Sequence, residues 1–339
     1  MPALEVIDLA TSFQTDDGTV RAVAGVSFSV DKGRTLGVVG ESGSGKSVTF
    51  LTLMGLLDPR LSQVSGSVLL HGEEMLGISQ SRLRQIRGAK IGMIFQDPMT
   101  SLNPVKTIGW QLEEAALLHQ DITRKEARRQ AVQILKEVEI PFAEQRVRDY
   151  PHQFSGGMRQ RVMIAMALVH NPDVLIADEP TTALDVTVQA QILELIDEVK
   201  KEFNIGVILV THDLGVVAET ANSVLVMYAG RVMEYGPASQ VFELPQHPYA
   251  WGLLDSMPTV ERRLEQLVPI EGSPPSLIAP PAGCPFHPRC PYVFGPCPTE
   301  RPPLVAPVPE AHLDACHLPW ERKVELGKKR SIARLGEPA

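Results

Sequence analysis

The stretch with the clearest chemistry is a glycine-rich loop, Gly40–Ser47, that follows the apolar run Thr35–Val39 and precedes a helical pattern over 48–57. Glycines let backbone N–H groups turn inward around a phosphate, and the start of the following helix adds partial positive charge. Lys46 is then expected to reach the β- and γ-phosphates, and the Ser47 hydroxyl to bind Mg²⁺. A flexible Gly/Ser turn is a poor account of this spacing. The predicted phosphate-binding residues are Gly40, Glu41, Ser42, Gly43, Ser44, Gly45, Lys46 and Ser47.

Two acidic residues, Asp178 and Glu179, directly follow the apolar run Val174–Ala177. A buried strand that ends in two acids is what Mg²⁺-dependent hydrolysis of a nucleoside triphosphate requires. Asp178 would complete the ligand shell of the metal, and Glu179 would polarise the attacking water. The alternative, two exposed turn acids, is disfavoured because the apolar run aims both carboxylates at the phosphate site.

Three further side chains stand at positions where a ligand group is expected. Gln96 follows the strand pattern Ile91–Phe95, at the strand end where α/β folds place ligand groups, although a lone Gln there is usually a turn residue. We expect it to bind the metal or the attacking water. His212 follows the run Gly206–Val210 at the same edge and is expected to hydrogen-bond the γ-phosphate. Phe13 either stacks on a purine base or belongs to the core, with neither favoured by spacing.

A second glycine-fronted helix start lies at Ser155–Gly157, before the apolar pattern Val162–Val169. Ser155 is a good N-cap, and glycines at a helix start expose unpaired N–H groups. A capped core helix explains the apolar pattern but leaves the Gly156–Gly157 pair unexplained. We therefore predict a second phosphate-binding device here.

The rest of the chain reads as an α/β body followed by a different kind of segment. Hydrophobic residues make up 44% of the 339 residues and charged residues 21%, which is ordinary for a soluble globular protein with room for one α/β domain and an extra module. From residue 245 onward the chain holds 19 of the 28 prolines and all four cysteines, which leaves little room for long helices. Strands are expected at 3–9, 22–30 and 67–71, and helices at 108–118, 123–139 and 188–202.

Charge and hydropathy exclude some classes of binding partner and some cellular locations for the protein. A formal net charge of −8 argues against a general nucleic-acid surface. No apolar run approaches the roughly 18 residues of a membrane span, and the N-terminus lacks the pattern of a secretory signal. A cytosolic protein is expected, with any membrane link supplied by a partner.

The cysteines are spaced as a cluster, with 5, 6 and 18 residues between neighbours, and the first three are each followed by proline. A cytosolic location disfavours disulfides, so four thiolates suit a tetrahedral zinc site or an iron–sulfur cluster, with free buried thiols as the third reading. The short C-x2–4-C pairs typical of structural zinc are absent. His287, His312 and His317 are alternative zinc ligands. The predicted metal ligands are Cys284, Cys290, Cys297 and Cys316.

In this order and spacing, the residues resemble the nucleotide-binding subunit of ATP-binding-cassette (ABC) transporters over 3–250. Phe154 and Met158 stand where Leu and Gln are commoner in the family signature. The matches are Phe13 for the base-stacking aromatic, Gly40–Ser47 for Walker A, Gln96 for the Q-loop, Ser155–Gly157 for the signature, Val174–Asp178 for Walker B, Glu179 for the catalytic glutamate, Ala183–Asp185 for the D-loop, and His212 for the switch histidine.

The resemblance implies a fold and a mode of action. The fold is α/β: a P-loop cassette over 1–250 with a RecA-like core, an antiparallel β subdomain and a helical subdomain at about 99–159, plus an irregular Pro/Cys-rich region over 251–339. ATP and Mg²⁺ would be clamped between two cassettes, the Walker A loop of one facing the signature of the other. Asp185 would belong to the same nucleotide site.

Four segments narrow the resemblance to the dipeptide, oligopeptide and nickel importer group: Phe95–Pro104, His247–Tyr249, Gly272–Ser276 and Gly283–Cys290. That group implies an ATPase for peptide import at the cytoplasmic face of the membrane, with a paralogous cassette, two transmembrane permeases and an extracytoplasmic substrate-binding protein as partners. Some of its members carry a [4Fe–4S] cluster in this tail, which ranks the cluster first and zinc second. The alternatives are import of nickel or another small solute, a soluble non-transport ABC ATPase, and a scaffold with degenerate hydrolysis.

Overall fold

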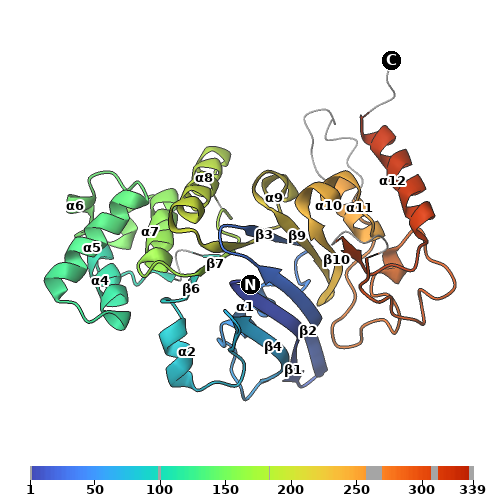
Figure 1. Cartoon of the computed structure of the whole chain (residues 1–339), viewed down its shortest axis with the longest axis horizontal. Helices are drawn as coiled ribbons and strands as arrows, with labels where there is room; N and C mark the ends of the chain where they lie inside the picture. Colours follow the sequence, from blue (N-terminus) through green and yellow to red (C-terminus); the bar gives the residue numbers. More distant parts are fainter. Residues whose placement is uncertain (1, 98–100, 183, 257–268, 307–311, 336–339) are drawn as a thin grey trace. The chain divides into compact units, whose positions relative to one another are not determined.

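The computed structural model describes residues 2–97, 101–182, 184–256, 269–306 and 312–335 (Figure 1). The chain forms two compact units, each built from several segments. The first comprises residues 1–4, 29–35 and 69–210, and the second 5–28, 36–68 and 211–339.

The first unit contains a parallel sheet flanked in sequence by helices. Strand β6 (Ile91–Ile94) pairs with β7 (Val174–Asp178), which pairs with β8 (Gly206–Val210). Every residue of β7 and β8 is buried, as expected for parallel strands covered on both faces. The other elements are β5 (Glu73–Glu74), α2 (Gln80–Ile86), α4 (Ile108–His119), α5 (Arg124–Glu137), α6 (Ala143–Arg146), α7 (Gly156–Leu168) and α8 (Val186–Phe203).

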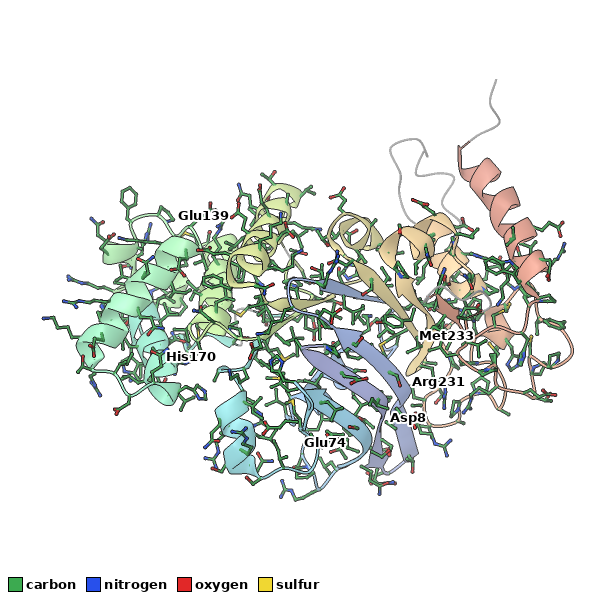
Figure 2. The ribbon with its side chains drawn as sticks, viewed as in Figure 1. Asp8, Glu74, Glu139, His170, Arg231 and Met233 are labelled. Atoms are coloured by element: carbon green, nitrogen blue, oxygen red, sulfur yellow. The ribbon has the colours of Figure 1, made fainter. Side chains whose placement is uncertain are left out.

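Local signals explain where these helices begin. Thr123 forms a capping box with Glu126 at the start of α5, and Thr107 caps α4. Glu139 and His170, labelled in Figure 2, follow the ends of α5 and α7, and each contacts another helix of this segment. Glu139, after α5, accepts a 2.7 Å hydrogen bond from Arg161 of α7, and a ring nitrogen of His170 lies 2.7 Å from the carbonyl oxygen of Ala115 in α4.

The second unit contains the long strands β1 (Leu4–Thr15), β2 (Gly18–Val30) and β4 (Ser62–Leu70), which lie in the order β2-β1-β4. It also contains β3 (Thr35–Val39), parallel to β9 (Ser223–Tyr228), which continues into antiparallel β10 (Arg231–Pro237) and β11 (Leu313–Asp314). The helices are α1 (Lys46–Leu53), α9 (Leu214–Thr220), α10 (Ala238–Glu243), α11 (Pro248–Asp255) and α12 (Trp320–Leu335), and the short helices η1 (Pro151–Gln153) and η3 (His287–Arg289) belong to the first and second units, respectively.

The expected α/β class is confirmed, and the strand–loop–helix order around the glycine loop is present as β3, loop and α1. The expectation of little room for long helices after residue 245 is wrong, because α12 runs for 16 residues. The reason is local: Pro319 precedes this helix, and no proline occurs between it and Pro338. No helix in the part of the chain that the structure describes is long and apolar enough to cross a membrane.

Candidate functional site

The glycine loop has a backbone path that only glycine accommodates at two points. Gly40 and Gly45 have φ angles of 149° and 99°, in the region that favours glycine. A Cβ on Gly40 would lie 2.1 Å from the carbonyl oxygen of Met227, and one on Gly45 would lie 2.4 Å from that of Ala22. The tight path holds the loop against β9 and β2 and explains why glycines recur at this spacing.

Lys46 lies inside this loop, with only 6% of its surface exposed. Its ammonium donates to the carbonyl oxygens of Gly40, at 2.7 Å, and Glu41, at 3.0 Å. Gly45 is the N-cap of α1, so the first N–H groups of that helix begin at the loop, and Ser47 stands half-buried in its first turn. A buried cation and a helix start in one loop make an anion-binding arrangement.

Two residues of the C-terminal half, Tyr249 and Arg289, contact the loop and were not predicted from the sequence. The Glu41 carboxylate accepts hydrogen bonds from both terminal nitrogens of Arg289, at 2.6 and 3.1 Å. The Glu41 backbone N–H donates to the Tyr249 hydroxyl at 2.8 Å. Both partners fall within segments that the importer resemblance singled out, but no spacing rule connects them to the loop.

The other second-unit residues predicted for the nucleotide site are His212 and Phe13. His212 is exposed on the segment between β8 and α9, and the neighbouring Thr211 N–H donates to the Val38 carbonyl of β3 at 3.1 Å. That bond fixes the start of the His212 segment beside the strand that leads into the glycine loop. Phe13 is half-buried on β1, and its predicted stacking on a base remains a prediction.

In the first unit the structure brings Gln96 and Glu179 together. The Gln96 side-chain amide donates to a carboxylate oxygen of Glu179 at 3.0 Å, and the Thr182 hydroxyl donates to the same oxygen at 2.8 Å. Glu179 has φ of 47°, which is uncommon for a residue with a side chain, and its N–H donates to the Val210 carbonyl at 2.8 Å. A strained, oriented carboxylate of this kind is typical of functional sites.

The two aspartates predicted for the nucleotide site have different surroundings. Asp178 ends β7 and is 6% exposed. Asp185 accepts the Val188 N–H at 3.0 Å and is the N-cap of α8, which gives it a structural role in addition to the predicted one. Of the sequence predictions, Ala183 of the D-loop and residues 98–100 of the importer segment lie outside the described residues.

The second glycine-fronted helix start has an explanation in packing as well. Ser155 is exposed and caps α7 by accepting the Met158 N–H at 3.3 Å, as predicted. A Cβ on Gly157 would lie 2.6 Å from the Val188 side chain of α8, so close helix packing requires this glycine. The argument that packing leaves the pair unexplained is therefore wrong for Gly157. Gly156 is exposed, and a Cβ there would meet Leu184 at an ordinary 3.5 Å.

All four cysteines line one small cavity of about 10 Å³, together with His247, His287 and His317. The cysteines are unpaired thiols, and burial raises the pKa of Cys290 to about 11 and that of Cys316 to about 12. Among the described residues, no three His, Cys, Asp or Glu side chains are gathered closely enough to hold a single metal ion. His312, one of the alternative zinc ligands, lies elsewhere.

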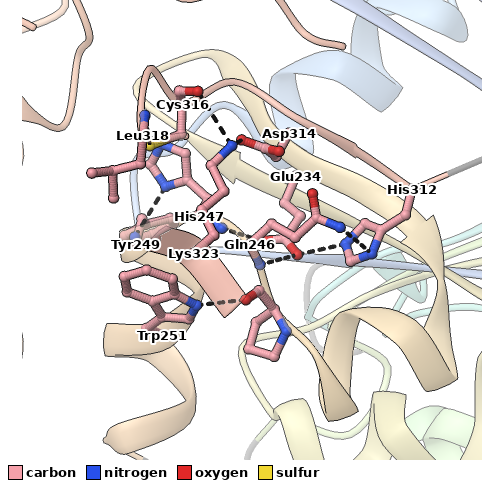
Figure 3. Close-up of polar contacts among 11 residues, drawn as sticks. Glu234, Gln246, His247, Tyr249, Trp251, His312, Asp314, Cys316, Leu318 and Lys323 are labelled. Carbon is pink, nitrogen blue, oxygen red and sulfur yellow. Dashed lines mark hydrogen bonds and ion pairs between the residues drawn. The ribbon is translucent and has the colours of Figure 1, made fainter. Parts of the chain in front are cut away.

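His312 belongs to a buried polar network around Glu234, which joins β10 to the C-terminal segment (Figure 3). The Glu234 carboxylate accepts from His312 Nε2 at 2.7 Å and from the backbone N–H groups of Gln246 and His247 at 2.8 Å each. Burial raises the pKa of Glu234. Beside it, the Lys323 ammonium of α12 donates to the Asp314 carboxylate of β11.

His247 connects this network to the cysteine cavity. Its Nδ1 accepts the Tyr249 N–H at 3.0 Å, which leaves the ring hydrogen on Nε2. Nε2 is buried, and the backbone of Ala315 favours the protonated ring. Burial lowers the pKa of His247 to about 3. The cavity that the cysteines share is therefore lined by a histidine whose ring is buried and neutral.

Comparison with known families matches two regions of the chain. Residues 23–182 match the family described as ABC transporter, and residues 233–297 match the oligopeptide/dipeptide transporter, C-terminal region. The second match contains Glu234 of β10, Tyr249, Arg289 and three of the four cysteines.

Comparison with individual proteins extends the similarity to nearly the whole chain. The chain is 52% identical over 318 residues to the oligopeptide transport ATP-binding protein OppD of Salmonella typhimurium, covering 94% of each. It is 54% identical over 289 residues to the dipeptide transport ATP-binding protein DppD of Bacillus subtilis, covering 85% of this chain and 86% of that protein. Among solved structures, a dimeric post-hydrolysis state of the ATP-binding cassette MJ0796 bound to ADP and Pi matches with a TM-score of 0.62 and 27% identity, over 69% of this chain and 98% of that one.

Proposed function

The chain belongs to the ABC transporter family, and from this membership we propose that it binds and hydrolyses ATP to energise the import of dipeptides and oligopeptides. The observation that carries the proposal is the glycine loop with its enclosed Lys46, an anion site in a chain 52% identical to an oligopeptide transport ATP-binding protein. The C-terminal match to the oligopeptide/dipeptide transporter region supports peptides over other solutes.

The residues have separate roles in this proposal. The N–H groups of Gly40–Ser47 and the Lys46 ammonium bind the phosphates. Ser47, Asp178 and Gln96 would be the oxygen ligands of Mg²⁺, which would supply charge neutralisation. Glu179, oriented by Gln96 and Thr182, polarises the attacking water. The roles of the second device, Ser155–Gly157 with Asp185, and of Phe13 and His212 stay as predicted from the sequence.

We propose that the working form is a pair of cassettes, this chain with a paralogous one, attached through two permeases at the cytoplasmic face of the membrane and served by an extracytoplasmic substrate-binding protein. The exposed Ser155 and Gly156 at the start of the 13-residue α7 support pairing, because such a helix start is open to an anion held by another chain. The dimeric form of the solved cassette is consistent with pairing.

The test is uptake of a labelled peptide by cells that depend on this transporter. Cells lacking this chain should not take up a labelled tripeptide; the wild-type chain should restore uptake, and Lys46→Ala should restore less than a tenth of it, because the phosphates lose their cation. Lys32→Ala is the matched control, since its side chain is 44% exposed and pairs with Asp173, and it should support wild-type uptake.

The outcome also separates the alternatives. Nickel uptake that depends on Lys46 while peptide uptake does not would favour the nickel importer. A chain that hydrolyses ATP but supports uptake of neither solute would favour a soluble ABC ATPase.

For the C-terminal region we propose a [4Fe–4S] cluster held by the four cysteines, with zinc as second choice. Four cysteines around one cavity are the donor set of such a cluster, and the buried Nε2–H of His247 offers a hydrogen bond to its sulfur atoms. Zinc ranks second because three ligands of one zinc ion stand only about 3.8 Å apart, and the described side chains are not gathered in that way. The cluster's role is structural in this proposal.

Anaerobically purified protein should then be brown, with broad visible absorbance and about four iron atoms per chain. Cys290→Ser should lose the colour and most of the iron, whereas Ser256→Ala, outside the cavity, should keep both. Colourless protein with stoichiometric zinc would establish the second choice, and protein with neither metal would leave free buried thiols.

A further inference from the structure

One contact joins the C-terminal region to the glycine loop: the ion pair between Arg289 and Glu41, residues 248 positions apart. It is a bidentate pair, with Nη1 to Oε2 at 2.6 Å and Nη2 to Oε1 at 3.1 Å. The Arg289 side chain is 5% exposed and that of Glu41 is 27% exposed. Paired, oriented charges with so little exposure interact more strongly than pairs in water.

The position of Arg289 is determined on every side. A guanidinium has five N–H donors, and all five of these have acceptors in the structure. Two bond the Glu41 carboxylate, and the other three go to the Tyr228 hydroxyl at 3.2 Å, the Ile270 carbonyl at 3.0 Å and the Glu271 carbonyl at 2.8 Å. The hydrogen bond to Glu41 is the main cause that raises the pKa of Arg289. Arg289 is therefore held in place to meet Glu41.

Glu41 in turn contacts the phosphate-binding lysine. Its N–H is held by the Tyr249 hydroxyl at 2.8 Å, and its carbonyl oxygen accepts from the Lys46 ammonium at 3.0 Å. Both the backbone and the side chain of Glu41 are thus fixed by residues of the C-terminal half. A continuous chain of contacts runs from Arg289 through Glu41 to Lys46.

The charge of Glu41 presents a problem for the proposed function. A carboxylate in a loop that binds a triphosphate repels it, and removing one member of a desolvated charge pair leaves the other uncompensated. Arg289 cancels that charge through its two hydrogen bonds to the Glu41 carboxylate. Since Arg289 directly precedes Cys290 of the cysteine cavity, the same contact makes the C-terminal region part of the nucleotide site.

We propose that Arg289 is a positioning residue for ATP binding: it neutralises and fixes Glu41, so that the glycine loop accepts the triphosphate only when the C-terminal region is docked on it. This inference rests on the proposed role of Gly40–Ser47 as the ATP phosphate site. It assigns Arg289 an effect on affinity, with no contact to the reacting atoms.

The test measures the Kd of the full-length chain for Mg-ATP, by displacement of a bound fluorescent ATP analogue. Arg289→Ala should raise the Kd for ATP at least tenfold, because a carboxylate is left uncompensated beside the phosphates. Arg289→Lys should recover part of the loss, since it restores the charge without the two-pronged geometry. Arg60→Ala is the matched control, because its pair with Asp58 is exposed and lies in the same unit.

If Arg289 acts by neutralising Glu41, removing the Glu41 charge should rescue the Arg289→Ala variant. In the Arg289→Ala background, Glu41→Gln removes the uncompensated charge and should bring the Kd back to within about threefold of the wild-type value. A purely structural role for Arg289 would not produce this rescue, and Arg289→Lys, which keeps the positive charge, is the test variant if Arg289→Ala fails to fold.

Wild-type affinity in a folded Arg289→Ala chain would overturn the inference while leaving the proposed function intact. A double variant that binds ATP as weakly as Arg289→Ala would also overturn it. If the wild-type chain itself bound no ATP, the proposed function would fail instead.

Discussion

Glu179→Gln is expected to reduce ATP hydrolysis at least a hundredfold while ATP still binds. The carboxylate is the group proposed to polarise the attacking water, and general base catalysis contributes roughly 10²- to 10⁴-fold. The amide keeps the size and an oxygen that accepts from Thr182, so the local structure around β7 should survive. The measurement is steady-state phosphate release by the transporter complex, with nucleotide binding measured in parallel.

The matched control is Glu144→Gln, at an exposed carboxylate of α6 that pairs with Lys136. It should hydrolyse ATP at the wild-type rate. Hydrolysis by Glu179→Gln at a rate near wild type would show that this chain's own carboxylate is not the base, and would favour the reading of the chain as a scaffold for its partner cassette. Trapping of ATP in the variant complex would favour the enzyme.

Glu234→Ala is expected to destabilise the second unit by about 3–5 kcal/mol. The carboxylate is fully buried and accepts three hydrogen bonds, so its removal leaves the N–H groups of Gln246 and His247 and the ring of His312 without their acceptor. Urea unfolding followed by tryptophan fluorescence should show the transition at lower urea, because Trp251 in α11 lies beside this network (Figure 3).

Glu325→Ala is the control for this loss of stability. Its carboxylate is 47% exposed and pairs with Arg322 one turn earlier on α12, a kind of ion pair worth at most about 1 kcal/mol. A Glu234→Ala midpoint as close to wild type as that of Glu325→Ala would mean that the buried network contributes little to folding.

Much of the fold and of the site was predictable, because short local sequence patterns specify the phosphate loop, the strand-end acids and the helix cap. The order apolar strand, glycine loop and helix predicts β3, the loop and α1, since glycine at positive φ and a lysine after it need only eight residues. The strand that ends in Asp178 and Glu179 was predictable for the same reason. The Ser155 cap is another local signal, a side chain three residues from its N–H partner.

What the sequence could not predict depends on contacts between distant segments. Nothing in the spacing of Arg289 points to Glu41, because that pairing is created by the way the C-terminal region folds back. Gly157 is required by a neighbouring helix whose approach is a packing result. The high proline content of the last 95 residues does not predict the helix α12. Helix formation depends on the local proline-free stretch, and α12 lies in one.

The lysine that hydrogen-bonds to its own loop has a kinetic consequence. Lys46 has carbonyl partners at 2.7 and 3.0 Å, and these hydrogen bonds hold the loop from within. In the proposed function, binding of a nucleotide would exchange these two carbonyl oxygens for phosphate oxygens around the Lys46 ammonium. Release after each turnover would reverse that exchange, so the same two carbonyl oxygens would again bind the ammonium.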